Sequence, residues 1–420
     1  MAGFAATIVV LLAAAGLLAA LYVARQRNVS LTQAIALIKF RTLFRLRLPN
    51  RPGPADRPVI HVYARQSGLD VAVLWSFLDR HSLHLLHERD QHSFILFGLR
   101  LFGQTAHAGD TAAIEAALAA GQSVSVPCPP EIEPQPQTLD SYRSLAALAR
   151  KHGAALRALH VRGSRFSLWS VHPKSKAPRH LLPRMTLGQS DLLDFNDISP
   201  AANGATDPRD EDRVHDQLAL ARYRSNDLER GLFLAFRDAC DTYGKAGPVL
   251  EDALGGKLTY KRTLIGARAL GAKFEAMSQP GEALGILLPN ANAVIVTFLA
   301  LQSAGRVAAM LNYTAGPAAL VSALSTAKIR TVLASRAFVD KAGLEAPVAA
   351  IEKAGVKIVW LEELRESITL IEKASAFVNW RRPLRAVKAS DPAVILFTSG
   401  SEGTPKGVVL SHTNIHANVA

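Results

Sequence analysis

The sequence predicts an α/β chain in which a membrane-spanning helix precedes two domains built on parallel sheets. Three observations indicate this fold class: an uncharged apolar segment at residues 2–24, short apolar runs that alternate with helical patterns, and a polar stretch near residue 200. The 420 residues, 49% apolar and 20% charged, are enough for two or three domains with separate cores. With only two cysteines, a disulfide scaffold and a cysteine zinc site are excluded.

The first element, residues 1–24, reads as a transmembrane helix. Residues 2–24 carry no charge, and at about 1.5 Å per residue they would span about 34 Å. A cleaved signal peptide, the alternative, should carry Lys or Arg ahead of the apolar run. Because the cations follow the segment instead, the positive-inside rule predicts a single-pass protein of the cytoplasmic (inner) membrane with its later domains in the cytoplasm.

The second element, residues 25–56, is a basic juxtamembrane segment. No carboxylate occurs before residue 52, and the cations are Arg25, Arg27, Lys39, Arg41, Arg45, Arg47 and Arg51. Aromatic platforms are sparse, which favours membrane phospholipid as the partner and gives no indication of nucleic acid. Apolar residues between Ser30 and Leu48 suit an interfacial helix, and a solvated basic linker is the alternative.

Residues 57–195 read as one α/β domain, and residues 196–225 as a polar linker. The runs VIHVYA, FILFGL, SVSVP and ALHVRG are strand candidates separated by longer mixed segments. Four histidines crowd together in this domain, at His81, His84, His87 and His92. Their spacing matches no standard ligand set, so we expect structural or surface histidines and predict no metal site.

Residues 226–420 read as a second domain with a parallel sheet. Strand candidates are ALGILL (283–288), IRTVLAS (329–335), KIVWL (357–361) and AVILF (393–397), and KLTY leads into a helix over 261–277. The stretch ANAVIVTFLALQSAG carries no charge. A charge-free strand, turn and helix is buried on both sides, as in a parallel sheet covered by helices.

Directly after AVILF comes a loop rich in hydroxyls and glycines, ending in a lysine. It contains Thr398, Ser399, Gly400, Ser401, Gly403, Thr404, Lys406 and Gly407. Glycines let backbone N–H groups approach phosphate oxygens, hydroxyls donate further hydrogen bonds, and the lysine supplies a positive charge. A strand-like VVLS follows instead of a helix, so this is not a Walker loop. The sequence predicts a phosphate cradle, with a flexible surface turn as the alternative.

The stretch TSGSEGTPKGVVLSH resembles the signature loop of the AMP-forming acyl-activating enzymes, which include acyl-CoA ligases and luciferases. Further similarity covers Leu258–Tyr260, Pro289–Asn290 and Ala304–Gly316. MLNYTAG and RTVLASRAFVDKA most resemble the bacterial acyl-acyl-carrier-protein synthetases that are fused to a lysophospholipid (2-acylglycerophosphoethanolamine) acyltransferase. The resemblance spans residues 226–420.

The resemblance implies that a fatty acid attacks ATP to give acyl-adenylate, which a thiol of acyl carrier protein or CoA then captures for phospholipid acylation. The loop hydroxyls would hold phosphate oxygens, Lys406 would offset charge on pyrophosphate, and Mg²⁺ would bridge ATP oxygens. Because the family's later adenine-binding and catalytic stretches lie beyond Ala420, we expect these residues to be the N-terminal part of a longer polypeptide. Alone they should not catalyse the full reaction.

In the fused family the preceding domain resembles glycerolipid acyltransferases, in which a His-x4-Asp pair deprotonates the acceptor hydroxyl. The matching stretch keeps Asp70 as a remnant of the pair, but Arg65 replaces the histidine and cannot act as a base. The second signature falls on Val126–Pro129 and lacks its glutamate and glycine. We therefore predict that residues 57–195 are a degenerate, inactive acyltransferase-like domain.

Two functions of different classes follow from the sequence. One is a membrane-anchored fatty acid–thiol ligase, and the other is a non-catalytic membrane platform that binds lipid or acyl carrier protein. The intact Lys406 and the three loop glycines favour the ligase.

Overall fold

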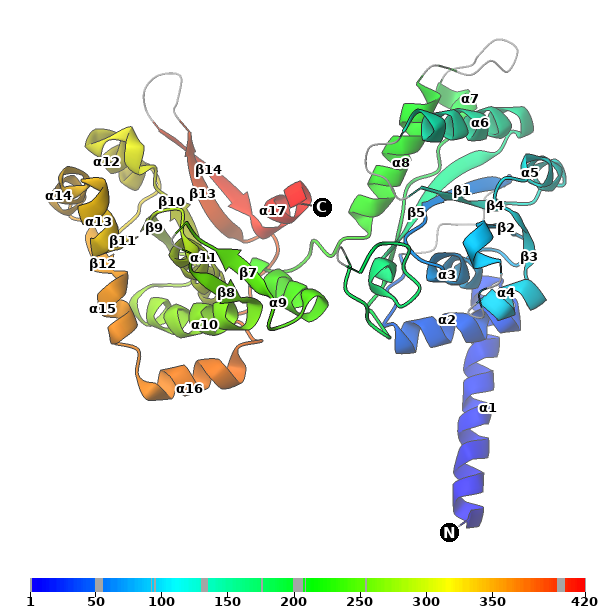
Figure 1. Cartoon of the computed structure of the whole chain (residues 1–420), viewed down its shortest axis with the longest axis horizontal. Helices are drawn as coiled ribbons and strands as arrows, with labels where there is room; N and C mark the ends of the chain where they lie inside the picture. The colour runs from blue at the N-terminus through cyan, green and yellow to red at the C-terminus, as the bar shows by residue number, and fades with distance from the viewer. Residues whose placement is uncertain are drawn as a thin grey trace. The chain divides into compact units, whose positions relative to one another are not determined.

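The computed structural model divides the chain into two compact units, residues 1–226 and 227–420. The structure describes residues 2–49, 56–91, 93, 96–129, 135–174, 177–198, 207, 209–253, 255–398 and 405–419. Each unit contains a six-stranded sheet covered by helices on both faces (Figure 1).

Unit 1 begins with two helices and continues as an α/β sheet unit. Its helices are α1 (Ala2–Arg27), α2 (Leu31–Leu43), α3 (Leu69–Phe77), α4 (Phe97–Phe102), α5 (Thr111–Ala119), α6 (Pro136–His152), α7 (Phe195–Ile198) and α8 (Asp210–Arg224), with 3-10 turns η1 (Glu88–Asp90) and η3 (Ser164–Phe166). Its strands are β1 (Val59–Ala64), β2 (Leu83–Leu86), β3 (Gln104–His107), β4 (Val124–Cys128), β5 (Ala155–Arg162) and β6 (Thr186–Gln189).

The unit 1 sheet has the order β3-β2-β4-β1-β5-β6, and only β6 pairs antiparallel. Side chains alternate along the strands, so Tyr63 and Leu159 join a core with α2, α3 and α4, while Ile60 and Leu156 join a core with α5, α6 and α8. Burial of β1 on both faces explains its largely apolar sequence, whereas the buried part of β5 also contains Arg157 and His160.

The prediction of a membrane-spanning helix at residues 1–24 is wrong. Over the described ranges given above, no helix has the length and apolar character needed to cross a membrane. Ala20 is instead buried against Val29 and Ala34. The predicted single-pass localisation in the inner membrane rested on this helix and is wrong for the same reason.

The segment expected to be an interfacial helix forms α2, which begins at a capping box. The Ser30 side chain accepts a hydrogen bond from the Gln33 amide, and the Gln33 side chain accepts one from the Ser30 amide. Gln33 is buried and its Nε2 donates to the Trp75 carbonyl at 2.6 Å, while Leu37 enters the core. Leu31 and Leu43 remain exposed. The helix is therefore tied to α3 along one side.

Two further predictions for unit 1 differ from the structure. Of the predicted strand FILFGL, Phe94 and Ile95 lie outside the described residues, and the part that is described begins α4. The N-cap Leu96 and Leu99 are both buried, three residues apart, which is the spacing of a helix face. The linker predicted over 196–225 contains α8, which packs on β5. Asp210 of α8 is fully buried beside Arg150, with an N–O distance of 3.0 Å. A polar stretch can lie inside a fold when its charges find partners far along the chain.

Unit 2 begins with a helix and a small hairpin. Its helices are α9 (Leu232–Tyr243), α10 (Tyr260–Met277), α11 (Asn292–Ala304), α12 (Pro317–Thr326), α13 (Arg336–Ala342), α14 (Glu345–Lys353), α15 (Leu361–Glu366), α16 (Leu370–Asn379) and α17 (His412–Val419), with the 3-10 turn η5 (Tyr313–Ala315). Its strands are β7 (Pro248–Glu251), β8 (Lys257–Thr259), β9 (Ala283–Leu287), β10 (Val307–Met310), β11 (Thr331–Ala334), β12 (Lys357–Trp360), β13 (Pro392–Thr398) and β14 (Lys406–Ser411).

The main sheet of unit 2 has the order β12-β11-β9-β10-β13-β14, and only β14 pairs antiparallel. Helices α9, α10 and α11 share a core with one face, and α12 and α14 share a core with the other (Figure 1). The four strand predictions in this unit are confirmed to within two residues at each end. Their apolar, nearly charge-free sequences follow from burial between two helix layers.

Candidate functional site

Three of the stretches of unit 2 that carry the family resemblance meet at one edge of its sheet. Pro289–Asn290 follows β9, residues 311–316 follow β10, and Thr398 ends β13. Strands β9, β10 and β13 are parallel neighbours, so their carboxyl ends lie side by side. Ligands of open α/β sheets bind at this edge. The candidate site of unit 2 is therefore the carboxyl edge around Thr398.

The predicted phosphate loop connects β13 to the antiparallel strand β14. Thr398 lies directly opposite Lys406, and Phe397 lies opposite Gly407. Both Thr398 and Lys406 are exposed, and Lys406 forms no ion pair with any residue that the structure describes. The remaining predicted loop residues, Ser399, Gly400, Ser401, Gly403 and Thr404, lie outside the described residues. The described part thus presents a hydroxyl and a cation at the two ends of the loop.

Buried contacts hold β13 in place beneath the loop. Ala393, Val394 and Ile395 are buried, and the Gln302 side chain of α11 donates from Nε2 to the Ala393 carbonyl at 3.1 Å. Gln302 is itself only 1% exposed, so this amide is fixed inside the core. A rigid strand beneath an exposed loop positions ligand-binding groups at low entropic cost.

His412 is a positioning residue that the sequence analysis did not single out. Its Nδ1 accepts a hydrogen bond from the Leu232 amide at 3.2 Å, which joins the end of β14 to the start of α9. Burial lowers the pKa of His412, which favours the neutral imidazole that can accept this bond. Thr413 adds a hydroxyl bond to the Ala389 carbonyl at 3.1 Å. The signal was present in the sequence, since His412 closes the motif VVLSH.

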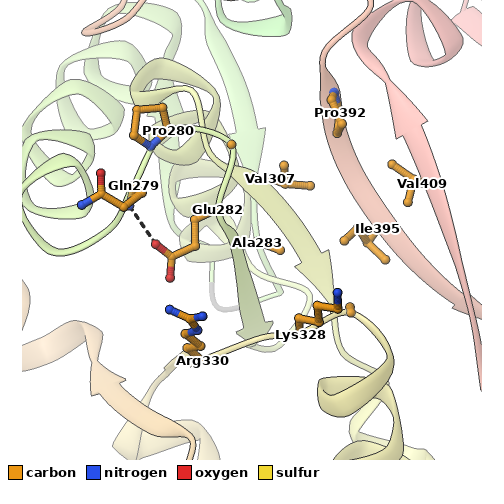
Figure 2. A pocket seen from close by; sticks show the side chains of 12 residues that line it. Gln279, Pro280, Glu282, Ala283, Val307, Lys328, Arg330, Pro392, Ile395 and Val409 are labelled. Carbon is orange, nitrogen blue, oxygen red and sulfur yellow. Dashed lines mark hydrogen bonds between the residues drawn. The ribbon is translucent and has the colours of Figure 1, made fainter.

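A separate hollow of about 520 Å³ opens at the opposite edge of the same sheet. Its lining includes the first residues of three strands, Ala283, Val307 and Pro392, together with Glu282 and Arg330 (Figure 2). Because β9, β10 and β13 are parallel, their amino ends lie a strand length away from the phosphate loop. This hollow does not belong to the candidate site.

In unit 1 the remnant aspartate and the substituted arginine also lie at a carboxyl edge. Arg65 follows β1 and forms two 2.7 Å hydrogen bonds to the carboxylate of Asp90, which follows β2. The side chains of Arg65 and Asp90 are only 11% and 8% exposed. A bidentate guanidinium–carboxylate pair occupies the place where the resemblance would put a base.

Asp70 lies at the start of α3 and is fully buried. Its Oδ2 accepts hydrogen bonds from the amides of Gln66 at 2.6 Å and Ser67 at 2.9 Å. Burial raises the pKa of Asp70 to about 7 despite these bonds. The Val126–Pro129 stretch lies next to this group, because Ala64 pairs with Cys128 and the Arg65 amide donates to the Cys128 carbonyl. The structure therefore brings the two altered signatures together.

The four clustered histidines occupy different environments. His84 is buried, and its Nδ1 lies 2.8 Å from the Ser125 hydroxyl. Burial lowers the pKa of His84 to about 3, so this imidazole is neutral at ordinary pH. His81 is exposed, His87 caps η1, and His92 lies outside the described residues. Among the residues whose placement is described, no group of three His, Cys, Asp or Glu side chains could hold a metal ion.

Comparison with known proteins finds a matching family and relatives for the second unit. Residues 236–420 match the family described as AMP-binding enzyme. A 4-coumarate–CoA ligase-like protein of rice is 29% identical over 223 residues, covering 49% of this chain and 36% of that protein. The medium/long-chain-fatty-acid–CoA ligase FadD6 of Mycobacterium tuberculosis is 29% identical over 159 residues, covering 37% and 25%. Residues 236–420 are therefore similar to AMP-binding enzymes, and the relatives named here are CoA ligases.

The chain and these relatives overlap over only part of their lengths. The chain spans about a third of the length of the curated relatives it matches. A parsley 4-coumarate–CoA ligase, for example, is 22% identical over 178 residues, which cover 42% of this chain and 32% of that protein. Among solved structures, VinN with 3-methylaspartate is 23% identical and has a TM-score of 0.37, with 46% of this chain and 51% of that chain covered.

Proposed function

We propose that this chain acts in an AMP-forming ligase reaction that activates a fatty acid with ATP and passes the acyl group to a thiol. The observation that carries this proposal is the loop between Thr398 and Lys406, which connects buried β13 to β14 at the carboxyl edge of the sheet. The match of residues 236–420 to the family described as AMP-binding enzyme supports it.

In the proposed first step the fatty carboxylate attacks the α-phosphorus of ATP, and the bond to pyrophosphate breaks. The loop hydroxyls of Thr398, Ser399, Ser401 and Thr404 would donate to phosphate oxygens, and the glycines at 400, 403 and 407 would let backbone amides approach. Lys406 would stabilise the negative charge that grows on pyrophosphate. Its exposure and its lack of an ion pair with a described residue suit it to that role.

Mg²⁺ would be held mainly through ATP oxygens, and the ion would neutralise phosphate charge. The described loop ends, Thr398 and Lys406, supply a hydroxyl and a cation, which suit phosphate more than a bare metal ion. We propose CoA or acyl carrier protein as the thiol that accepts the acyl group in the second step. The resulting thioester would supply phospholipid acylation.

Unit 1 has a non-catalytic role in this proposal. Arg65, at the position where the resemblance puts the base, is permanently protonated and paired with Asp90, so it would not act as a base. Asp70 would then be a structural carboxylate at the start of α3.

The experiment uses the native polypeptide that contains these residues and measures fatty-acid-dependent ATP–pyrophosphate exchange. We expect Lys406→Ala to lower the exchange rate by about tenfold or more, because a charge-stabilising donor is lost. Lys353→Ala, at an exposed lysine of α14, is the matched control and should leave the rate unchanged. An unchanged rate in Lys406→Ala would remove the loop from the mechanism.

A further inference from the structure

Helix α16 turns an apolar stripe toward solvent. Leu370 and Ile371 are each 82% exposed, Phe377 is 57% exposed and Val378 is 75% exposed. With the exposed Ala374 they recur at helical spacing and form one continuous face, which we call the α16 stripe. A surface helix normally turns such a stripe toward the core, so an outward stripe marks an interaction site.

The opposite side of α16 fixes the helix against α10. Ala376 and Ile368 pack with Ala269 of α10, and Ile265 lies against the same cluster. The N-terminus is closed by a capping box in which Thr369 and Glu372 exchange hydrogen bonds. Glu372 also pairs with Lys273 of α10 at 2.9 Å. These contacts determine which face of α16 points outward.

Helix α16 and the segment that follows it carry more positive than negative charge. Glu372 is the one carboxylate between residues 370 and 388, and the cations of that segment are Lys373, Arg381, Arg382, Arg385 and Lys388. Arg381 pairs with Asp241 at 2.6 Å and Arg385 lies 3.8 Å from Glu275. From α10, Lys261 places its ammonium 4.5 Å from the centre of the Phe377 ring. The cations of this segment and Lys261 still outnumber the carboxylates of Glu372, Asp241 and Glu275.

We propose that α16 is an interfacial helix with which unit 2 binds the surface of an anionic phospholipid bilayer. The α16 stripe would enter the boundary between headgroups and acyl chains, and the surrounding cations would contact lipid phosphates. The helix lies flat on the lipid, so the contact needs no segment that crosses it. This inference is independent of the proposed ligase activity, since none of the residues on which it rests belongs to the loop between Thr398 and Lys406.

Charge and shape favour a bilayer over a second copy of the chain. Two α16 stripes docked face to face would bring both sets of cations together, which is unfavourable. The apolar side chains also stand out from a single helix, and a fluid lipid surface accepts such a ridge without a matching groove.

The test places a fluorescent reporter at the stripe. Cys128 and Cys240 are both buried, so a maleimide probe whose emission depends on polarity should label Phe377→Cys selectively in the folded chain. We expect its emission to shift to the blue with phosphatidylcholine vesicles that contain about one-third phosphatidylglycerol, and to shift much less with pure phosphatidylcholine. A quencher attached to the lipid acyl chains should then reduce the emission. Lys353→Cys, labelled on α14, is the matched control and should show neither effect.

Cosedimentation with the same vesicles gives the size of the effect. Ile371→Ser combined with Phe377→Ser should weaken binding by about tenfold or more, since both side chains are exposed and their loss removes apolar area without disturbing the core. Leu181→Ser combined with Leu182→Ser, exposed in unit 1, should leave binding unchanged.

Three results would overturn the proposal: no emission shift with anionic vesicles, equal shifts with neutral vesicles, or a shift that depends on protein concentration without lipid. The last would indicate a second copy of the chain at the stripe. Pyrophosphate exchange is measured without vesicles, so failure of this proposal and failure of the ligase proposal are distinguishable.

Discussion

The two units share a sheet architecture but differ at the carboxyl edge. Each has five parallel strands and a sixth that pairs antiparallel at one side, β6 in unit 1 and β14 in unit 2. In unit 1 the charged residues at the edge, Arg65 and Asp90, are buried and bonded to each other. In unit 2 Lys406 is exposed and has no described ionic partner.

This difference shows that the architecture does not decide whether an edge can bind a ligand. A cation already satisfied by a buried carboxylate contributes to folding and cannot also bind phosphate. An exposed cation contributes little to stability and remains available. We therefore expect substitutions at the unit 1 edge to lower stability and substitutions at the unit 2 edge to leave it nearly unchanged. The stability of each unit is measured by hydrogen exchange of backbone amides, in β1 for unit 1 and in β13 for unit 2.

The largest expected effect comes from breaking the pair in unit 1. Asp90→Ala leaves Arg65 buried without its carboxylate, which should lower the free energy of unfolding of unit 1 by about 3–5 kcal/mol. Asp191→Ala is the matched control, because the Asp191 side chain is 74% exposed in its pair with Arg224, and it should cost at most about 1 kcal/mol. Similar losses in both variants would contradict a structural role for the buried pair.

A smaller effect, dependent on pH, is expected at Asp70. Its pKa of about 7 in the folded state lies above the ordinary value, so between about pH 4 and pH 7 the carboxyl is protonated in the folded state and ionised in the unfolded state. The free energy of unfolding of unit 1 therefore falls as pH rises through this range. Asp70→Asn removes this ionisation. The free energy of unfolding of the variant minus that of the native protein should therefore increase by about 2 kcal/mol between pH 5 and pH 8. Asp140→Asn, at an exposed carboxylate, is the control. A constant difference across this range would show that the buried carboxyl is not protonated.

The smallest effect on stability is expected at Lys406. Lys406→Ala should change the free energy of unfolding of unit 2 by no more than about 0.5 kcal/mol, because the side chain is exposed. A loss well above 1 kcal/mol in β13 exchange would make Lys406 a structural residue and would weaken the contrast between the two edges. Unchanged stability of Lys406→Ala together with a lower rate of ATP–pyrophosphate exchange would show that Lys406 acts in the reaction and not in folding.

Much of unit 2 could be predicted from sequence because its signals are local. Strands buried on both faces have continuous apolar sequences, and the loop after β13 is a contiguous run of residues with phosphate-binding chemistry. The FILFGL prediction failed because a short apolar run fits a strand and a buried helix equally well. The membrane-span prediction failed because it took apolar length alone, whereas the described part of α1 packs through Ala20 on Val29 and Ala34.

The layered α/β class, most strands and the hydroxyl- and glycine-rich composition of the loop after β13 follow from the sequence, because they depend on neighbours within a few residues. Which charges are neutralised depends on the tertiary structure. Arg65 pairs with Asp90 and Arg150 with Asp210, across 25 and 60 positions of sequence. The tertiary structure also decided that α16 keeps its small Ala376 against α10 and turns its large apolar residues outward. Both outcomes depend on which elements meet in space, and that is set by packing of the whole unit.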